Sequence, residues 1–307
     1  MAVTAAMVKE LREITGVGMM DCKKALAETD GNMEQAIEFL REKGLAAAAK
    51  KAGRIASEGL VHIVITDDNR VGAVVEVNSE TDFVAKNQEF QAFVSDVAKQ
   101  AVHSKANDVD TLLDESWTAT GEGTVRDALN QKIAVIGENL NIRRFARFEK
   151  QSDGALISYI HGGGRVAVLL ELACEKPGDA LTEAGKNVCM QIAAMSPKFV
   201  SRDEVSEEFI QKEKEILTQQ ALNEGKPANI VEKMIEGRLN KELKEFCLVE
   251  QEYVKDGDMN VSKYLETVSK EIGAAITVKR FARFETGEGI EKKEENFAEE
   301  VSKAMQG

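Results

Sequence analysis

The segment from His161 to Arg165 combines a histidine, three consecutive glycines and an arginine, which are residue types that bind anions or do acid–base chemistry. A glycine-rich turn with Gly162 at its start can present backbone N–H groups to an anion, and the arginine can add two parallel hydrogen bonds. The segment also stands between two apolar runs, where glycines are typical of a β-hairpin turn. We interpret it as that turn. A small hydrolase that uses His161 remains an alternative, although no nucleophile stands at a telling spacing from it.

Two other glycine patterns do not make nucleotide sites. Gly178 and Gly185 are separated by six residues where a phosphate loop has four, and Asn187 replaces the required serine or threonine. Gly16 and Gly18 resemble the start of a dinucleotide fingerprint, but no strand precedes them. The three histidines and four cysteines lack metal-ligand spacing, and we interpret the cysteines as reduced, buried thiols. We therefore predict no catalytic residue, no metal and no cofactor, so that the chain is not an enzyme.

Residues 81–87, which read Thr-Asp-Phe-Val-Ala-Lys-Asn, place an aromatic side chain next to a carboxylate between a predicted strand and a predicted helix. Binding residues often lie on such loops, because the flanking elements hold them rigidly. The alternative is that Phe83 belongs to the core and that Thr81 or Asp82 caps a helix. The sequence pattern alone leaves both interpretations open.

The composition restricts the partners that this chain can have. With 40 Lys and Arg against 53 Asp and Glu, the net charge is -13, which disfavours direct binding to nucleic acid because phosphates need a basic surface. No stretch of 18 uncharged apolar residues is present, so we predict no membrane span. The first turns contain charged residues instead of the apolar core of a signal peptide. We expect a soluble, cytoplasmic protein.

Residues 1–54 contain three short helical patterns, and Thr4 is expected to cap the first. Their apolar positions are Met7, Val8, Leu11 and Ile14, then Met19, Cys22, Ala25 and Leu26, and then Met33, Ala36, Ile37 and Leu40. We expect Gly44 to end the third helix, and residues 45–54 to form a helical or flexible linker.

The centre of the chain contains an internal repeat. Ser57-Glu58-Gly59 recurs as Ser152-Asp153-Gly154 at an offset of 95 residues, and each copy continues as two apolar runs around a turn. The pattern predicts strands at 60–66 and 71–77 in the first copy, and at 155–160 and 165–172 in the second. Residues 141–149 recur as 277–285 at an offset of 136, with the alternation of a half-buried strand. The larger offset indicates an insertion in the second copy.

Helical patterns occupy the remaining intervals. One runs through Phe90 to Ala101 with Asn87 as its cap, and another covers residues 179–195 and stops before Pro197. Residues 204–223 and 228–245 predict two helices joined by a Gly-Lys-Pro turn, and this helical hairpin is the expected insertion. The acidic tail after Gly287 is expected to form a short amphipathic helical arm. The fold class is therefore α+β.

Two segments carry a family resemblance. Residues 16–26, which read Gly-Val-Gly-Met-Met-Asp-Cys-Lys-Lys-Ala-Leu, and residues 81–87 resemble the two signature segments of the elongation factor Ts family. The resemblance continues in order through 52–53, 161–165, 225–227 and 287–292. Gly163, where the family often has alanine, and a charged loop at 104–123 are its departures.

The resemblance implies a domain organisation. Residues 1–54 would form a domain similar to ubiquitin-associated domains, and 55–150 would form the N-terminal subdomain of the core. Residues 151–197 and 246–286 would form the C-terminal subdomain of the core. Residues 198–245 would form a helical-hairpin dimerisation module, and 287–307 a C-terminal module.

The resemblance also implies a function and a binding site. A member of this family is a guanine-nucleotide exchange factor that binds elongation factor Tu in its GDP form, dislodges Mg²⁺ and promotes GDP release. The loop that dislodges Mg²⁺ would be Thr81, Asp82, Phe83 and Val84. Further partner-binding residues would be Met19, Met20, Lys23, His161, Gly162 and Arg165. A ubiquitin-associated-type adaptor is the alternative, since it explains residues 1–54 but assigns no role to residues 81–87.

Overall fold

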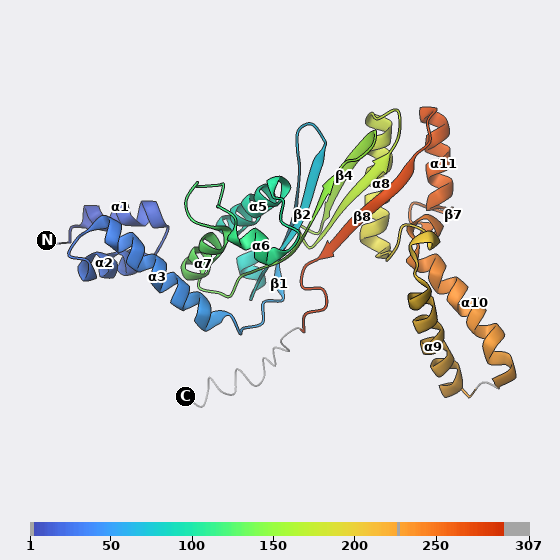
Figure 1. Cartoon of the computed structure of the whole chain (residues 1–307), viewed down its shortest axis with the longest axis horizontal. Helices are drawn as coiled ribbons and strands as arrows, with labels where there is room; N and C mark the ends of the chain where they lie inside the picture. The colour runs from blue at the N-terminus through green and yellow to red at the C-terminus, as the bar shows by residue number, and fades with distance from the viewer. Residues whose placement is uncertain (1–2, 226–227, 292–307) are drawn as a thin grey trace. The chain divides into compact units, whose positions relative to one another are not determined.

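The computed structural model describes residues 3–225 and 228–291 and mixes helices with small sheets, as expected for the α+β class (Figure 1). Its contacts divide the chain into two compact units. The first unit contains residues 1–62, 75–145 and 285–307, and the second contains residues 63–74 and 146–284. The expected helical arm of residues 287–307 lies mostly outside the described residues.

The first unit begins with three helices around a small core: α1 (Ala5–Thr15), α2 (Met19–Glu28) and α3 (Met33–Lys51). Thr4 caps α1 as predicted, because its hydroxyl accepts a hydrogen bond from the Met7 N–H at 3.3 Å. The core side chains are Val8, Leu11, Cys22, Ala25, Leu26, Ala36 and Leu40. Ile14 and Met19 were expected on this apolar face, but both side chains are exposed.

The prediction that Gly44 ends the third helix is wrong. Helix α3 continues through this glycine to Lys51, because its second half packs against α7 (Val125–Ile136). A Cβ atom at Gly44 would lie 3.6 Å from the Ala134 Cβ, and Arg41 forms an ion pair with Asp127 at 2.6 Å. Tertiary packing thus overrides the helix-breaking tendency of glycine at this position.

The first sheet has the order β1-β2-β3, with strands β1 (Glu58–Ile65), β2 (Val71–Ser79) and β3 (Asn141–Glu149). Helices α4 (Asp82–Ala85), α5 (Gln88–His103), α6 (Val109–Asp114) and α7 connect β2 to β3. Asn87 caps α5 as predicted, and the predicted apolar face of α5, including Phe90, Phe93 and Val97, is buried. Helices α6 and α7 were not assigned from the sequence.

The second sheet has the order β4-β5-β8, with strands β4 (Gly154–His161), β5 (Val166–Ala173) and β8 (Thr277–Glu285). β4 and β5 are antiparallel, with a register that runs from Gly154 opposite Ala173 to His161 opposite Val166. Helix α8 (Asp179–Met195) packs on both strands, and α11 (Val261–Ile272) packs on α8. The short strands β6 (Glu252–Tyr253) and β7 (Asp256–Asn260) precede α11.

Two helices that form a hairpin follow α8 as expected: α9 (Glu207–Asn223) and α10 (Ala228–Phe246) (Figure 1). They contact each other and share a small apolar core. Its buried members are Leu217, Ala221, Val231, Ile235, Leu239 and Leu243. The turn residues 226–227 lie outside the described residues.

Replacing Gly154 with alanine should destabilise the second unit by about 2 kcal/mol, because of both backbone strain and overpacking. Gly154 has a φ of +144°, and a Cβ there would lie 1.9 Å from the Leu172 carbonyl oxygen. All three tyrosines lie in the second unit, so their near-ultraviolet signal can follow its unfolding in urea. Gly178→Ala is the matched control within the second unit, since no atom lies within 4 Å of its added Cβ. Equal stability of both variants would contradict the close approach at Gly154.

Candidate functional site

The loop after β2 is organised by Thr81. Its hydroxyl accepts a hydrogen bond from the Val84 N–H at 3.4 Å and so caps the four-residue helix α4. The helix ends at Ala85, and the N–H of the capping residue Lys86 donates to the carbonyls of Asp82 and Phe83. The turn therefore directs consecutive side chains in different directions, with Val84 buried and its two predecessors exposed.

Phe83 is not part of the core, so the core interpretation of this residue is wrong. The side chain is 80% exposed, which is unusual for an aromatic residue in an ordered segment. The Lys86 ammonium lies 5.9 Å from the centre of its ring. The part of the same alternative that made Thr81 a helix cap is confirmed, because its hydroxyl accepts from the Val84 N–H. Thr81 thus caps α4 while Phe83 stays exposed.

Asp82 adds a negative charge beside the exposed ring. Its carboxylate lies 2.6 Å from the Lys86 ammonium, one helical turn away, and both side chains are more than half exposed. The hydrogen bond from Lys86 lowers the pKa of the Asp82 carboxyl, with a smaller contribution from the charge of Lys86. The loop thus presents a ring and an ionised carboxylate together.

The base of the loop is held by two residues that sequence analysis missed, Glu138 and Asn139. One oxygen of the Glu138 carboxylate accepts from the N–H groups of Glu80 at 3.1 Å and Thr81 at 3.0 Å. The other oxygen accepts from the Thr81 hydroxyl at 2.6 Å. In the opposite direction, the Asn139 N–H donates to the Glu80 carboxylate at 2.6 Å. The left-handed Gly137, which ends α7, is the one local signal of this turn.

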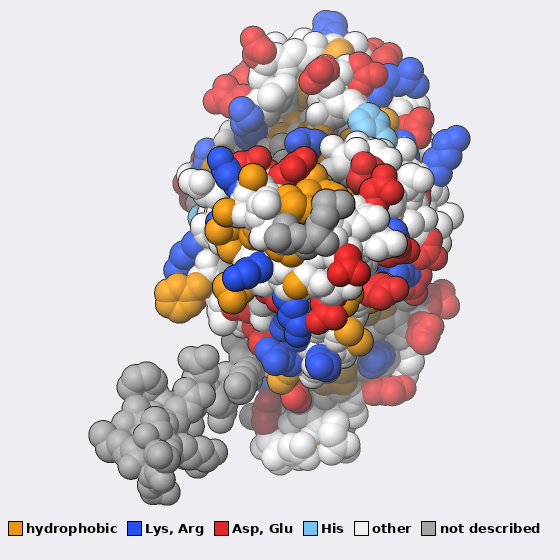
Figure 2. All heavy atoms as spheres, turned by 90° about the vertical axis from the view of Figure 1, so that its left-hand side faces the viewer, with side chains coloured by type: hydrophobic (Ala, Val, Ile, Leu, Met, Phe, Trp, Pro, Cys, Tyr) orange, Lys and Arg blue, Asp and Glu red, His pale blue; other side chains and the backbone are white. Residues whose placement is uncertain are grey.

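Helix α2 exposes a second group of expected binding residues. Met20 is 76% exposed and Met19 is 49% exposed, both in the first turn of α2, and Lys23 is exposed one turn later. Figure 2 views the side that carries this helix and shows hydrophobic side chains gathered near several lysine and arginine side chains. Such an apolar area with a charged border is typical of a protein-binding surface.

The third group lies at the turn between β4 and β5, in the second unit. His161 is exposed, and its Nδ1 lies 2.9 Å from the Tyr159 hydroxyl. Gly162 has a φ of +59°, and the Arg165 N–H donates to the His161 carbonyl at 3.1 Å, which closes the turn. Arg165 is exposed. The prediction of a glycine-rich strand-connecting turn is confirmed, and the turn presents a ring and a cation.

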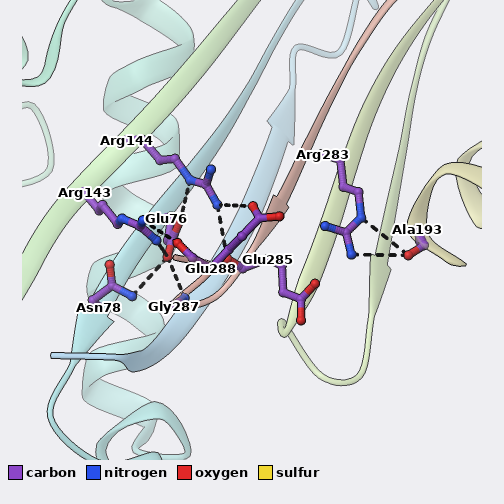
Figure 3. Close-up of polar contacts among 9 residues, drawn as sticks. All are labelled: Glu76, Asn78, Arg143, Arg144, Ala193, Arg283, Glu285, Gly287 and Glu288. Carbon is purple, nitrogen blue, oxygen red and sulfur yellow. Dashed lines mark hydrogen bonds and ion pairs between the residues drawn. The ribbon is translucent and has the colours of Figure 1, made fainter. Parts of the chain in front are cut away.

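The beginning of the C-terminal segment is anchored by a buried carboxylate, Glu76 of β2 (Figure 3). The Gly287 N–H donates to it at 2.8 Å, and it forms ion pairs with Arg143 at 3.0 Å and Arg144 at 2.5 Å. Arg144 also pairs with Glu288 at 3.0 Å. The site residues therefore lie on separate elements, namely α2, α4 with its cap, and the β4–β5 turn. Glu76 and its arginines hold Gly287 and Glu288, at the start of the last segment, within the first unit.

Other chemistry has little support in the described part of the chain. Residues 3–225 and 228–291 contain no group of three or more His, Cys, Asp and Glu side chains arranged to hold a metal ion. The four cysteines are free and buried as predicted, and burial raises the pKa of the Cys189 thiol. Among the helices of these residues, none is long and apolar enough to cross a membrane.

Comparison with known proteins assigns the family. Residues 80–288 match the model of the family described as Elongation factor TS. The chain belongs to the elongation factor Ts family. The chain is 58% identical over 301 residues to the elongation factor Ts of Clostridium perfringens strain SM101, covering 98% of both chains. It is 57% identical over 304 residues to the elongation factor Ts of Clostridium tetani, and the match covers 99% of this chain and 100% of the relative. The identity to the elongation factor Ts of Clostridioides difficile is also 57% over 304 residues, and the match covers 99% of each chain.

Membership of the elongation factor Ts family confirms the expected class of function. The chain is a translation elongation factor with the role of a nucleotide-exchange factor, and not an enzyme. The matched region contains the loop with Phe83, strand β3, the second sheet and the turn with His161, whereas β1 and β2 of the first sheet precede it. The three-helix segment precedes the matched region, but the relatives cover it as well.

Proposed function

We propose that this chain binds elongation factor Tu in its GDP form, inserts the Thr81–Val84 loop next to the nucleotide, dislodges Mg²⁺ and so promotes release of GDP. GTP can then bind to the empty site. The observation that carries this proposal is the exposure of Phe83 on a capped and anchored loop. An exposed aromatic ring gains free energy when a partner buries it, and a rigid base allows the ring to displace the partner's own groups.

The charge of the loop supports the same step. Phosphates and Mg²⁺ are held by a closely balanced set of charges and backbone donors. The ionised Asp82 carboxylate would disturb that balance when it comes near, because a negative charge repels the phosphates and attracts the Mg²⁺ that they hold. Asp82 therefore acts on the charge of the nucleotide site, and Phe83 acts on its packing.

Binding has to be spread over several surfaces. Moving the partner from mostly GDP-bound to mostly factor-bound requires about 5.5 kcal/mol of differential affinity, and GDP must weaken the factor by the same amount as the factor weakens GDP. One loop of four residues supplies only part of this. We propose that Met19, Met20 and Lys23 hold the nucleotide-binding domain of the partner together with the C-terminal module, and that the turn with His161, Gly162 and Arg165 contacts another of its domains.

The other expectations from the sequence complete the proposal. Residues 1–54 are proposed as a domain similar to ubiquitin-associated domains, followed by the core subdomains of 55–150 and of 151–197 with 246–286. The chain acts in the cytoplasm on a protein partner, without direct contact to nucleic acid or membrane. The adaptor function is less favoured, because it gives no role to the exposed ring of Phe83.

The test is release of a fluorescent GDP analogue from purified elongation factor Tu, with and without catalytic amounts of this chain. Strong acceleration that disappears in the Asp82→Ala/Phe83→Ala double variant supports both the function and the site. A matched control is Lys50→Ala, which removes an exposed charged side chain from α3 in the same unit. A folded wild-type sample that does not accelerate release would refute the proposal and favour the adaptor.

We also propose that residues 198–245 are a dimerisation module. Helices α9 and α10 bury one apolar core between them, yet α9 still exposes Ile216 and Leu222. Sedimentation velocity at increasing concentration should show a monomer–dimer equilibrium that Ile216→Lys/Leu222→Lys shifts towards monomer. Gln220→Lys, an exposed position of the same helix, should leave the equilibrium unchanged. A wild-type chain that is monomeric at every concentration would exclude the module.

A further inference from the structure

The exposed ring of Phe83 requires something other than its own packing to fix its direction. A side chain that is 80% exposed has few contacts that restrict it, and α4 contains only residues 82–85. The direction of the ring is therefore set by the backbone at the start of α4. That backbone is set in turn by Thr81, whose hydroxyl accepts from the Val84 N–H.

The orientation of the Thr81 hydroxyl depends on Glu138. A hydroxyl has one hydrogen, and here it points to the Glu138 carboxylate at 2.6 Å, so that a lone pair faces the Val84 N–H. The other Glu138 oxygen accepts from the two consecutive N–H groups of residues 80 and 81. One carboxylate thus satisfies three donors in the segment that precedes α4.

The hydrogen bonds run in both directions, because the turn after α7 also donates to the segment that precedes α4. The Glu80 carboxylate accepts from the Asn139 N–H at 2.6 Å and from Arg54 at 3.4 Å. The Asn139 side chain donates to the Arg54 carbonyl at 2.8 Å. Side chains and backbones of residues 80–81 and 138–139 therefore hold each other, and hydrogen bonds to charged groups are the stronger class of such contacts.

We propose that Glu138 is a positioning residue that orients the Thr81–Val84 loop for nucleotide release. This inference rests on the proposed function, and it deepens it by assigning the orientation of Phe83 to a carboxylate 57 positions after Thr81 in the sequence. Glu138 does not need to touch the partner, because its oxygens already accept from the loop.

The first experiment uses the free chain and does not depend on the partner. Amide hydrogen exchange of residues 80–86 should become at least about tenfold faster in Glu138→Ala, since the loop loses three hydrogen bonds to a charged group. Glu138→Gln should be intermediate, because its single carbonyl oxygen can replace one of the two carboxylate oxygens. Glu122→Ala, an exposed carboxylate of the same unit, is the matched control. Unchanged exchange in Glu138→Ala would overturn the inference.

The second experiment compares GDP release from elongation factor Tu by wild type, Glu138→Ala, Phe83→Ala and the double variant. If Glu138 acts through the loop, Glu138→Ala slows release about tenfold, and the double variant is no slower than Phe83→Ala alone. Multiplicative effects would overturn the inference, because they mean that Glu138 acts independently of Phe83. An inactive wild type would refute the proposed function, and the role of Glu138 in release with it, while amide exchange still decides whether Glu138 holds the loop.

Discussion

Replacing Phe83 with alanine is expected to slow release of GDP from elongation factor Tu by about a hundredfold, the size of effect that a central aromatic residue has in a protein interface. The physical reason is that the ring is 80% exposed in the free chain and contributes binding free energy only when the partner buries it. The free energy of unfolding should change by less than about 0.5 kcal/mol, as for other exposed positions. Release kinetics and urea unfolding of the same sample measure the two effects.

Phe93→Ala is the matched control for this substitution. Phe93 lies on α5 in the same unit, is 3% exposed, and its ring centre lies 5.9 Å from that of Trp117. Its truncation should destabilise the chain by about 3–5 kcal/mol while leaving release per folded molecule nearly unchanged. If Phe83→Ala instead behaved like Phe93→Ala, with lost stability and intact release, the ring of Phe83 would not be the group that acts on the partner.

Replacing Glu76 with alanine is expected to destabilise the first unit by about 3 kcal/mol, because removal of one member of a buried ion pair leaves its partners uncompensated. The Glu76 side chain is fully buried, and it accepts from Arg143, Arg144, Asn78 and the Gly287 N–H (Figure 3). The two arginines are a quarter to a third exposed, so water can solvate their guanidinium groups in the variant, and this limits the loss of stability. Amide exchange should also become faster around Gly287.

Trp117 offers a convenient measurement, because it is the single tryptophan of the chain and lies buried in the same unit. Its fluorescence in urea should show a lower unfolding midpoint for Glu76→Ala. Glu288→Ala is the control: this half-exposed carboxylate pairs with the same Arg144, and a pair of that kind contributes about 1 kcal/mol or less. Equal midpoints for the two variants would show that burial of Glu76 does not govern stability here.

The repeat gives the Glu76 contact a counterpart in the second unit. The offset of 95 residues relates Glu76 to Glu171, and the offset of 136 relates Arg144 to Arg280. The structure contains both pairs, with Arg144 Nε at 2.5 Å from Glu76 and Arg280 Nε at 2.7 Å from Glu171. The repeated sequence pattern therefore reflects a repeated contact between the middle and last strands of each sheet. Sequence analysis aligned these residues without predicting that they pair.

The sequence determined the features that depend on neighbouring residues. The strands predicted at 141–149 and 277–285 agree with the bounds of β3 and β8, although most side chains of both strands are half-buried and do not alternate between buried and exposed. The helix of residues 179–195 was also predicted, as were the caps at Thr4 and Asn87, since cap chemistry acts over three residues. The segment that contains the candidate loop was identified for the same reason, because it stands between a strand and a capped helix.

The tertiary structure decided the features that depend on distant residues. The exposure of Phe83 could not be read from a four-residue helix, which is too short to show a periodic pattern. The continuation of α3 through Gly44 depends on α7, and the anchoring of Thr81 depends on Glu138. Such contacts join residues far apart in the sequence and leave no local spacing, so they appear only when the folded chain brings a carboxylate to the donors it satisfies.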